Sequence, residues 1–402
     1  MTSVTTTETD LLERAADAPM LAQVEKWAAV NSGTGNLAGL KTVAGALADA
    51  FAALPGEVRL VAADPVESVD SAGTVNTIQR GDHLHVRVRP EAPVQLLLTG
   101  HMDTVFAADH PFQTLKWLDD GVLNGPGTAD MKAGISVILA ALTAPEASPL
   151  ASRVGYDVMI NSDEETGSQA SARLIAELAK GKTAALTYEP ALPDGTLAGA
   201  RPGSGNFSVI VHGRAAHAGR NPHDGRNAIV AASDLVLRIK ALEAGDITVN
   251  PAKIEGGSAN NVVPDLAILR FNIRPQSTDA MNRFDGQLAA ILDIVRSEHD
   301  VVIHRHGGVT RPPKPVDEKA QRLFDLVKAC GAELGQQIGW KSTGGVCDGN
   351  NIAACGIPVV DTMGPRGGAI HSSDEFLIVA SLAERAQLSA LTMTRIAERG
   401  TV

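Results

Sequence analysis

Cysteine and aromatic residues are both scarce in this chain, and each scarcity excludes a class of protein. The 402 residues include three cysteines, Cys330, Cys347 and Cys355, and 3% of the residues are aromatic. An odd and sparse set of cysteines does not suit the disulfide framework of a small secreted domain and favours a reducing compartment. Because 44% of the residues are hydrophobic, we expect a globular protein whose core consists of aliphatic side chains and alanine.

Positive charge and long apolar runs are lacking as well. The formal net charge of −11 argues against a nucleic-acid partner, which requires a basic face. No run approaches the ~18 apolar residues that span a membrane. The amino-terminal stretch 1–10 is acidic and rich in threonine, whereas a secretory signal has a basic and then an apolar region. We therefore expect a cytoplasmic enzyme or binding protein that acts on neither nucleic acids nor membranes.

The length predicts two or three domains, and the order of the expected elements indicates where they lie. Apolar segments of strand length alternate with helical segments up to about residue 198, which is typical of an α/β domain. Over 199–311 the expected order is β-α-β-β-α-β, the order of a ferredoxin-like module. The proline-rich segment 312–315 forms a stiff linker. We therefore expect an α/β domain made of 1–198 and 312–402, interrupted by a smaller inserted domain over 199–311.

Acidic and imidazole side chains follow three of the strands expected in the α/β sheet. His101 and Asp103 follow the strand at 94–98, Glu164 and Glu165 follow 156–162, and Glu189 follows 184–188. Each has an ordinary alternative interpretation, as a chance strand ending or as solvated loop acids. The carboxyl ends of parallel strands meet at one edge of a sheet, so chance placement of such residues after three strands is hard to accept. We expect these side chains to form one cluster.

A glycine-rich turn between the first two of these strands contributes another carboxylate. The segment 124–134 contains three glycines and brings Asp130 to the start of an expected helix that ends near residue 142. Alone, Asp130 would be interpreted as a helix N-cap. Its place between the flanking strands makes it the natural bridge if two cations share the site.

A neighbouring strand, expected over 83–89, alternates polar and apolar residues. His83 and His85 alternate with Leu84 and Val86. A period of two places both histidines on the polar face of the strand. We therefore expect surface histidines without a role in the site.

Histidine and carboxylates without a thiolate suit Zn²⁺, Mn²⁺ or Co²⁺. The number of groups fits two metal ions about 3.5–4 Å apart that share a bridging carboxylate. Glu164 and Glu165 are adjacent, so their side chains should diverge; one can bind metal while the other stays free as a general base. This machinery predicts hydrolysis of an amide or an ester.

The chain resembles the di-zinc M20 metallopeptidases, the group of glutamate carboxypeptidase, succinyl-diaminopimelate desuccinylase and acetylornithine deacetylase. Six short segments carry the resemblance, in order along the chain: Gly-His-Met-Asp-Thr-Val at 100–105, Gly-Pro-Gly-Thr-Ala-Asp-Met-Lys at 125–132, Ser-Asp-Glu-Glu-Thr-Gly at 162–167, Glu-Pro at 189–190, Gly-Arg-Ala-Ala-His-Ala-Gly at 213–219 and His-Ser-Ser-Asp-Glu at 371–375. Each is weak singly, but six in order are a specific signal.

The resemblance implies the fold and the metal site. The fold would be a phosphorylase/hydrolase-like α/β catalytic domain with a mixed sheet, interrupted by a ferredoxin-like dimerisation and lid domain. Asp130 would bridge two divalent ions, with zinc favoured and cobalt or manganese as alternatives. Asp103 would orient a metal-binding histidine, Glu164 would be the general base, and the Asp130–Met131 peptide bond would be cis. The ligand sets would be His101, Asp130 and Glu189 for one ion, and Asp130, Glu165 and His371 for the other.

The resemblance also implies substrate contacts and a homodimer. His217 would reach the partner subunit's site and steady the oxyanion of the tetrahedral intermediate. Asn260 and Arg274 would hold the substrate's free α-carboxylate, and Gly345 would lie on a substrate-rim loop at 344–350. Arg201 and Lys341 are weaker candidates for binding an acidic side chain. Cys347, on the same loop, could be a nucleophile, but a cysteine hydrolase needs no carboxylate cluster.

Three functions stay open. The first is metal-dependent hydrolysis of an amide bond that releases an amino acid, with glutamate or aspartate favoured, from an N-acyl or peptide conjugate. The resemblance associates a carboxylate at Glu189 with both the glutamate-carboxypeptidase and the desuccinylase branches, and a histidine at this position with several aminoacylase-like members. The second is a deacylase or desuccinylase of the same fold that recognises the acyl side. The third is a non-catalytic binding protein, although neither Glu164 nor any expected ligand is missing.

Overall fold

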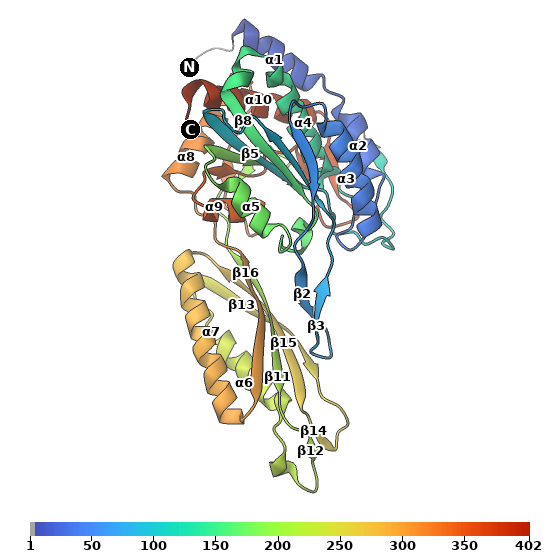
Figure 1. The fold of residues 1–402 in the computed structure, drawn as a ribbon, viewed down its shortest axis with the longest axis vertical. Coiled ribbons are helices and arrows are strands. Elements are labelled where there is room, and N and C mark those ends of the chain that lie inside the picture. Colours follow the sequence, from blue (N-terminus) through green and yellow to red (C-terminus); the bar gives the residue numbers. More distant parts are fainter. Residues whose placement is uncertain (1–4, 120) are drawn as a thin grey trace.

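The computed structural model describes residues 5–119 and 121–402, and the chain folds into two parts (Figure 1). The larger part holds both ends of the described chain and a six-stranded sheet with helices on its two faces. The smaller part is an elongated antiparallel sheet with two helices on one side. Mixed α/β architecture was the expectation, and it is confirmed.

The large sheet has the strand order β1-β4-β8-β5-β9-β18. The strands β8, β5, β9 and β18 are parallel, while β4 runs antiparallel to β8 and β1 antiparallel to β4. The three strands expected to end at the cluster are therefore direct neighbours. The bounds are β1 Glu57–Val61, β4 His83–Val88, β5 Val94–His101, β8 Val154–Asn161, β9 Ala184–Thr187 and β18 Val359–Val360.

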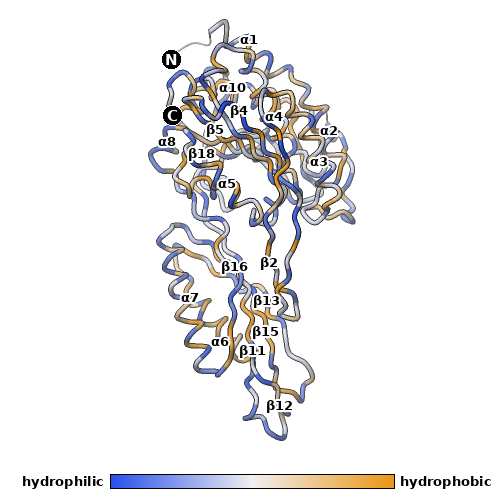
Figure 2. The backbone as a smooth tube through the Cα atoms, in the orientation of Figure 1, coloured by the Kyte–Doolittle hydropathy of each residue, from blue (hydrophilic) through white to orange (hydrophobic). Residues whose placement is uncertain are grey.

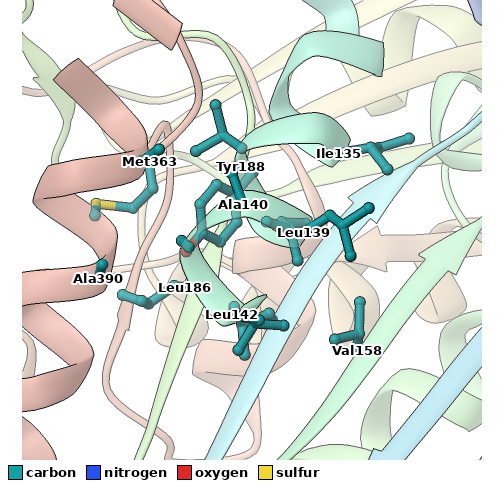
Figure 3. Close-up of a cluster of buried hydrophobic side chains, with 14 of the residues drawn as sticks. Ile135, Leu139, Ala140, Leu142, Val158, Leu186, Tyr188, Met363 and Ala390 are labelled. Atoms are coloured by element: carbon teal, nitrogen blue, oxygen red, sulfur yellow. The ribbon is translucent and has the colours of Figure 1, made fainter. Parts of the chain in front are cut away.

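The central strands are buried on both faces, as their continuous apolar sequences predict. On β5, Leu96 and Leu98 belong to the main core, whereas Leu97 faces a second core beneath α5 and α9. Figure 3 shows Leu139 and Leu142 of α4 in the same buried cluster as Val158 and Leu186 of the sheet. The helices of this part are α1 Thr6–Ala16, α2 Met20–Ala28, α3 Leu37–Phe51, α4 Ala133–Glu146, α5 Ala172–Ala179, α8 Glu318–Glu333, α9 Asp348–Ala354 and α10 Ser381–Arg399.

The smaller part has the expected β-α-β-β-α-β order. Its sheet runs β13-β15-β11-β16 with antiparallel neighbours. It encloses its own core, in which Phe207, Phe271 and Phe284 meet, and Figure 2 shows hydrophobic colour along β11 and β15. The elements are β11 Ser204–His212, α6 Ala228–Lys240, β13 Ile247–Gly256, β15 Leu266–Pro275, α7 Thr278–His299 and β16 Val302–Arg311.

A hairpin from the large part reaches the small sheet. It consists of β2 Val66–Val69 and β3 Val75–Ile78. Val69 packs against Ile210 and Ile268, and Arg270 Nη2 donates a hydrogen bond to the Val69 carbonyl at 2.9 Å. The hairpin therefore ties the two parts together (Figure 1). The remaining strands are β6 Lys116–Asp119, β7 Val122–Asn124, β10 Leu197–Ala198, β12 Ala216–His217, β14 Val262–Val263, β17 Trp340–Lys341, β19 Gly367–Gly368 and β20 Phe376–Ile378.

The prediction of surface histidines on β4 was wrong. His83 and His85 are each 1% exposed, because β4 lies between β1 and β8 and its polar face is covered. His85 Nε2 lies 2.6 Å from Asp157 Oδ1, and Arg87 and Lys182 pair with the same carboxylate. The alternating pattern thus marks a buried ionic network instead of a solvent face.

The chain before residue 30 is helical but interrupted. It forms two helices, and Pro19 stands at the start of the second. Proline lacks the backbone N–H that would continue the first helix. Within the described residues, no helix combines the length and hydropathy needed to cross a membrane.

Candidate metal centre

The predicted ligands meet where β5, β8 and β9 end. His101 is the last residue of β5, Glu164 and Glu165 form the turn after β8, and Glu189 follows β9. His101 Nε2 lies 3.1 Å from Asp130 Oδ1 and 3.7 Å from Glu189 Oε2. The parallel register of the strands therefore assembles side chains that are 88 positions apart in sequence.

Asp130 lies between two histidines. Its Oδ1 is 3.1 Å from His101 Nε2, and its Oδ2 is 3.3 Å from His371 Nε2. His371, in the loop between β19 and β20, is also 3.3 Å from Glu165 Oε2. One carboxylate thus presents one oxygen to each imidazole, which is the arrangement expected of a ligand shared by two cations.

Asp103 holds both the histidine and the acidic turn. Its Oδ1 lies 3.3 Å from His101 Nδ1, and its carbonyl oxygen lies 3.0 Å from the same nitrogen. Its two carboxylate oxygens accept the backbone N–H groups of Glu164 and Glu165, each at 3.2 Å. These contacts leave Nε2 of His101 to face Asp130, as a metal-binding histidine requires.

Glu375 fixes the turn that carries Asp130, a role that the motif alone did not reveal. It is 1% exposed and accepts backbone N–H groups from Gly127 at 3.1 Å, Ala129 at 2.9 Å and Asp130 at 3.0 Å. The Asp130–Met131 peptide bond is cis, as the resemblance implied. The place of Glu375 in the motif at 371–375 was the one indication in the sequence of a role at the site. The turn that Glu375 binds lies 245 positions earlier in the chain.

The site has an excess of buried negative charge. Burial raises the pKa of Glu164 and Glu189 above the usual range, and burial with the nearby Asp130 charge raises that of Glu165 to about 7. Burial opposes ionisation of Asp130 too, but hydrogen bonds from the two histidines hold its pKa well below normal. Carboxylates in such surroundings are stabilised by a bound cation.

The two histidines respond to the same charge. Burial alone would lower the pKa of His101, but the carboxylates of Glu189, Asp103 and Asp130 outweigh it and raise the pKa well above 6.5. Hydrogen bonds to Asp130 and Glu165 raise the pKa of His371 to about 10. The carboxylates of the cluster therefore favour a positive charge among their oxygens. His101 lies with Glu164 and Glu189, and also with Asp130 and Glu165, in groups whose possible ligand atoms are within 4.8 Å of one another. Such imidazole and carboxylate donors fit Zn²⁺, Co²⁺ or Mn²⁺.

A cavity of about 290 Å³ opens beside the cluster. Asp130, Glu164, Glu189, His371 and Gly345 are among the residues that line it. Arg201 also lines it, but its Nε lies 2.7 Å from Asp361 Oδ2, and its Nη1 donates to the Gly345 carbonyl at 3.1 Å. Arg201 is therefore already paired, which weakens it as a ligand for an acidic substrate group.

Cys347 lines the same cavity without the properties of a nucleophile. It is buried, and burial raises the pKa of its thiol well above the usual value. Since the thiolate is the reactive form, this environment disfavours covalent catalysis by cysteine. The interpretation of Cys347 as a small residue on the rim agrees with its surroundings.

Three predicted residues lie outside this cavity. His217 and Asn260 are exposed, and Arg274 on β15 is half-buried, with its Nε donating to Asn272 Oδ1 at 3.1 Å. His217 lies on β12, at the end of the small part that is remote from the large sheet (Figure 1). Among the described residues, none of these three lines the cavity of its own chain.

Arg311, at the end of β16, is a site contact that sequence reasoning missed. Its Nη2 lies 2.5 Å from Glu164 Oε1, and its Nη1 binds Asp348. No local pattern distinguishes this arginine from the others of the small part. Only the return of the chain into the large part brings it to Glu164.

Known proteins resemble this chain in sequence and in fold. The family model described as Peptidase family M20/M25/M40 matches residues 97–395. Carboxypeptidase G2 of Pseudomonas sp. strain RS-16 is 30% identical over 322 residues, covering 77% of this chain and 76% of the relative. A succinyl-diaminopimelate desuccinylase of Halorhodospira halophila is 30% identical over 340 residues, covering 79% and 85%. The Bacillus subtilis YXEP protein, described as a dinuclear metal-binding peptidase of the M20 family, superposes with a TM-score of 0.64 at 14% identity, covering 94% and 98%.

Proposed function

Since the chain belongs to peptidase family M20/M25/M40 and is a hydrolase of amide bonds, we propose that it cleaves an N-acyl amino acid or peptide conjugate with the help of two divalent metal ions. The proposed product is an amino acid of the glutamate or aspartate type. The observation that carries the proposal is Asp130, with its two oxygens 3.1 and 3.3 Å from the Nε2 atoms of His101 and His371.

The metal ligands would be those that converge at the strand ends. His101, Asp130 and Glu189 would hold one ion, and Asp130, Glu165 and His371 the other, with zinc favoured and cobalt or manganese as alternatives. Bound ions of this kind lower the pKa of water and polarise a carbonyl group. Glu164 would accept the proton of the attacking water and pass it to the leaving nitrogen, while Asp103 keeps His101 oriented.

The substrate contacts would be divided between two subunits. Asn260 and Arg274 would bind the free α-carboxylate, for which a guanidinium group has the matching planar geometry, and Gly345 would line the rim. His217 would steady the oxyanion. Because His217, Asn260 and Arg274 lie outside the cavity of their own chain, we propose a homodimer in which the inserted segment 199–311 serves as dimerisation and lid domain and completes the partner's site.

Two relatives favour different answers to which half of the substrate the protein recognises. Carboxypeptidase G2 favours recognition of the released amino acid, and the desuccinylase, at the same 30% identity, favours recognition of the acyl group. We retain acyl-side specificity as the second candidate. A non-catalytic binding protein is not favoured, because Glu164 and all five expected ligands are present. The cytoplasmic location stays a prediction.

A substrate panel tests the proposal. The zinc-loaded protein is assayed on N-acyl amino acids in which the acyl group and the amino acid are varied separately, before and after removal of metal with a chelator. We expect hydrolysis that depends on metal and that discriminates the amino acid more sharply than the acyl group. Sharper discrimination of the acyl group would select the second candidate, and full activity without metal would refute the metal-dependent mechanism.

A further inference from the structure

The carboxylate of Glu164 is held by a residue from the other part of the molecule. Arg311 is the last residue of β16, and it is 1% exposed. Its Nη2 lies 2.5 Å from Glu164 Oε1 and 3.2 Å from the Glu164 carbonyl oxygen. Among the described residues, this guanidinium is the hydrogen-bond partner of the Glu164 side chain.

The backbone around Glu164 is fixed independently of Arg311. Asp103 accepts the N–H groups of Glu164 and Glu165, so the turn keeps its place when the side chain moves. A glutamate side chain has three rotatable bonds, and without a partner it populates several rotamers. The contact with Arg311 selects one of them through Oε1, and Oε2 has no hydrogen-bond partner in the part of the chain that the structure describes.

The opposite end of the guanidinium is anchored in α9. Its Nη1 binds Asp348 and lies 2.9 Å from Asn351 Oδ1. Asp348 is in turn held by Asn161, and by Ser168 Oγ at 2.6 Å. Because the planar group is bound on two sides, its orientation toward Glu164 is fixed. Lysine, with a single ammonium group, cannot bridge both carboxylates in the same way.

We propose that Arg311 is a positioning residue that holds the Glu164 carboxylate in the orientation needed for proton transfer. The inference rests on the proposed role of Glu164 as general base. A base displaced by about 1 Å can cost about 10²-fold in rate. Arg311 is not assigned a contact with substrate or metal; it acts through Glu164.

A double-mutant cycle in the full-length, zinc-loaded protein tests this role. We expect R311Q to lower kcat about 10²-fold, with KM changed by less than about threefold. R311K should recover about tenfold of this loss. In the E164Q background, R311Q should lower kcat by less than about threefold, because the group that Arg311 positions is gone. The matched control is R305Q on the same strand, where Arg305 pairs with Asp285, and it should leave kcat unchanged.

Two kinetic results would overturn the proposal. One is an equal loss from R311Q in the wild-type and E164Q backgrounds, which would show that Arg311 acts independently of Glu164. The other is a raised KM with an unchanged kcat, which would make Arg311 a substrate-binding residue. Zinc content is measured for every variant, and a loss of zinc in R311Q would likewise contradict a role through Glu164.

Thermal unfolding of the metal-free variants gives a readout that does not depend on activity. R311Q removes the counter-charge of buried Glu164, so its melting temperature should fall by about 5 °C. Adding E164Q should recover part of that fall, whereas a further decrease would show that the two side chains are not coupled. If the wild-type chain hydrolysed no substrate, the proposed function would fail, while this cycle would still decide whether the contact holds Glu164.

Discussion

Replacing Glu375 by glutamine should weaken metal binding although Glu375 is not a proposed ligand. Its Oε1 accepts the N–H groups of Ala129 and Asp130, and its Oε2 accepts that of Gly127. An amide has one acceptor oxygen, so in E375Q an NH₂ group would face the Gly127 N–H, donor against donor. The turn that presents Asp130 would then have to move.

The expected size follows from the lost interaction. A hydrogen bond to a charged acceptor contributes about 1.5–3 kcal/mol, and about 1.4 kcal/mol corresponds to a factor of ten in an equilibrium constant. We assume that this free energy is lost only in the metal-bound state, in which Asp130 must hold its position. E375Q should then bind zinc about 10–100-fold more weakly, in the range found for groups that orient metal ligands.

Competition with a chromophoric chelator measures the affinity. D374N is the matched control: Asp374 is the neighbouring exposed residue, and D374N makes the same change of charge. We expect the D374N affinity to stay within about threefold of wild type. Wild-type affinity in E375Q would refute the reasoning, because it would show that the turn presents Asp130 without the carboxylate.

Further predictions concern the base, the dimer and a pH-dependent network. E164Q should retain zinc but lose about 10²–10⁴-fold in kcat, as measured by metal analysis and steady-state kinetics; an unchanged kcat would remove Glu164 from the role of base. Mixing H217A with E164Q subunits under exchange should restore about a quarter of wild-type activity, because half of the dimers then hold one complete site; no recovery after proven exchange would contradict a contribution across the interface. Burial opposes ionisation of Asp157, but hydrogen bonds from His85 and Lys182 outweigh it and hold its pKa well below normal. Because the folded pKa lies below that of the unfolded chain, ionised Asp157 stabilises the fold at neutral pH, and this contribution declines progressively as the pH falls below about 4 toward the folded pKa. The melting temperature of D157N should therefore lie below wild type at pH 7, with a difference that shrinks under acidic conditions; a difference independent of pH would refute the linkage.

Local sequence was sufficient for the elements and for the residue types of the site. Continuous apolar runs identified β5, β8 and β9, because parallel strands covered on both faces are commonly apolar throughout. The polar residues directly after them marked the edge where ligand sites of α/β sheets lie. His85 shows the limit of this reasoning: the same alternation describes a solvent face and a face covered by ionic partners, and only the presence of Asp157 and Lys182 separates the two.

The sequence by itself determined which imidazole and carboxylate side chains stand at the strand ends and in the turns, since strand and turn patterns are local. The tertiary structure decided how they are held. Glu375 reaches back to the Asp130 turn, and Arg311 meets Glu164 from the end of the smaller sheet, at separations of 245 and 147 positions. Such contacts depend on how strands and loops distant in the sequence pack together, and no periodicity along the chain encodes them.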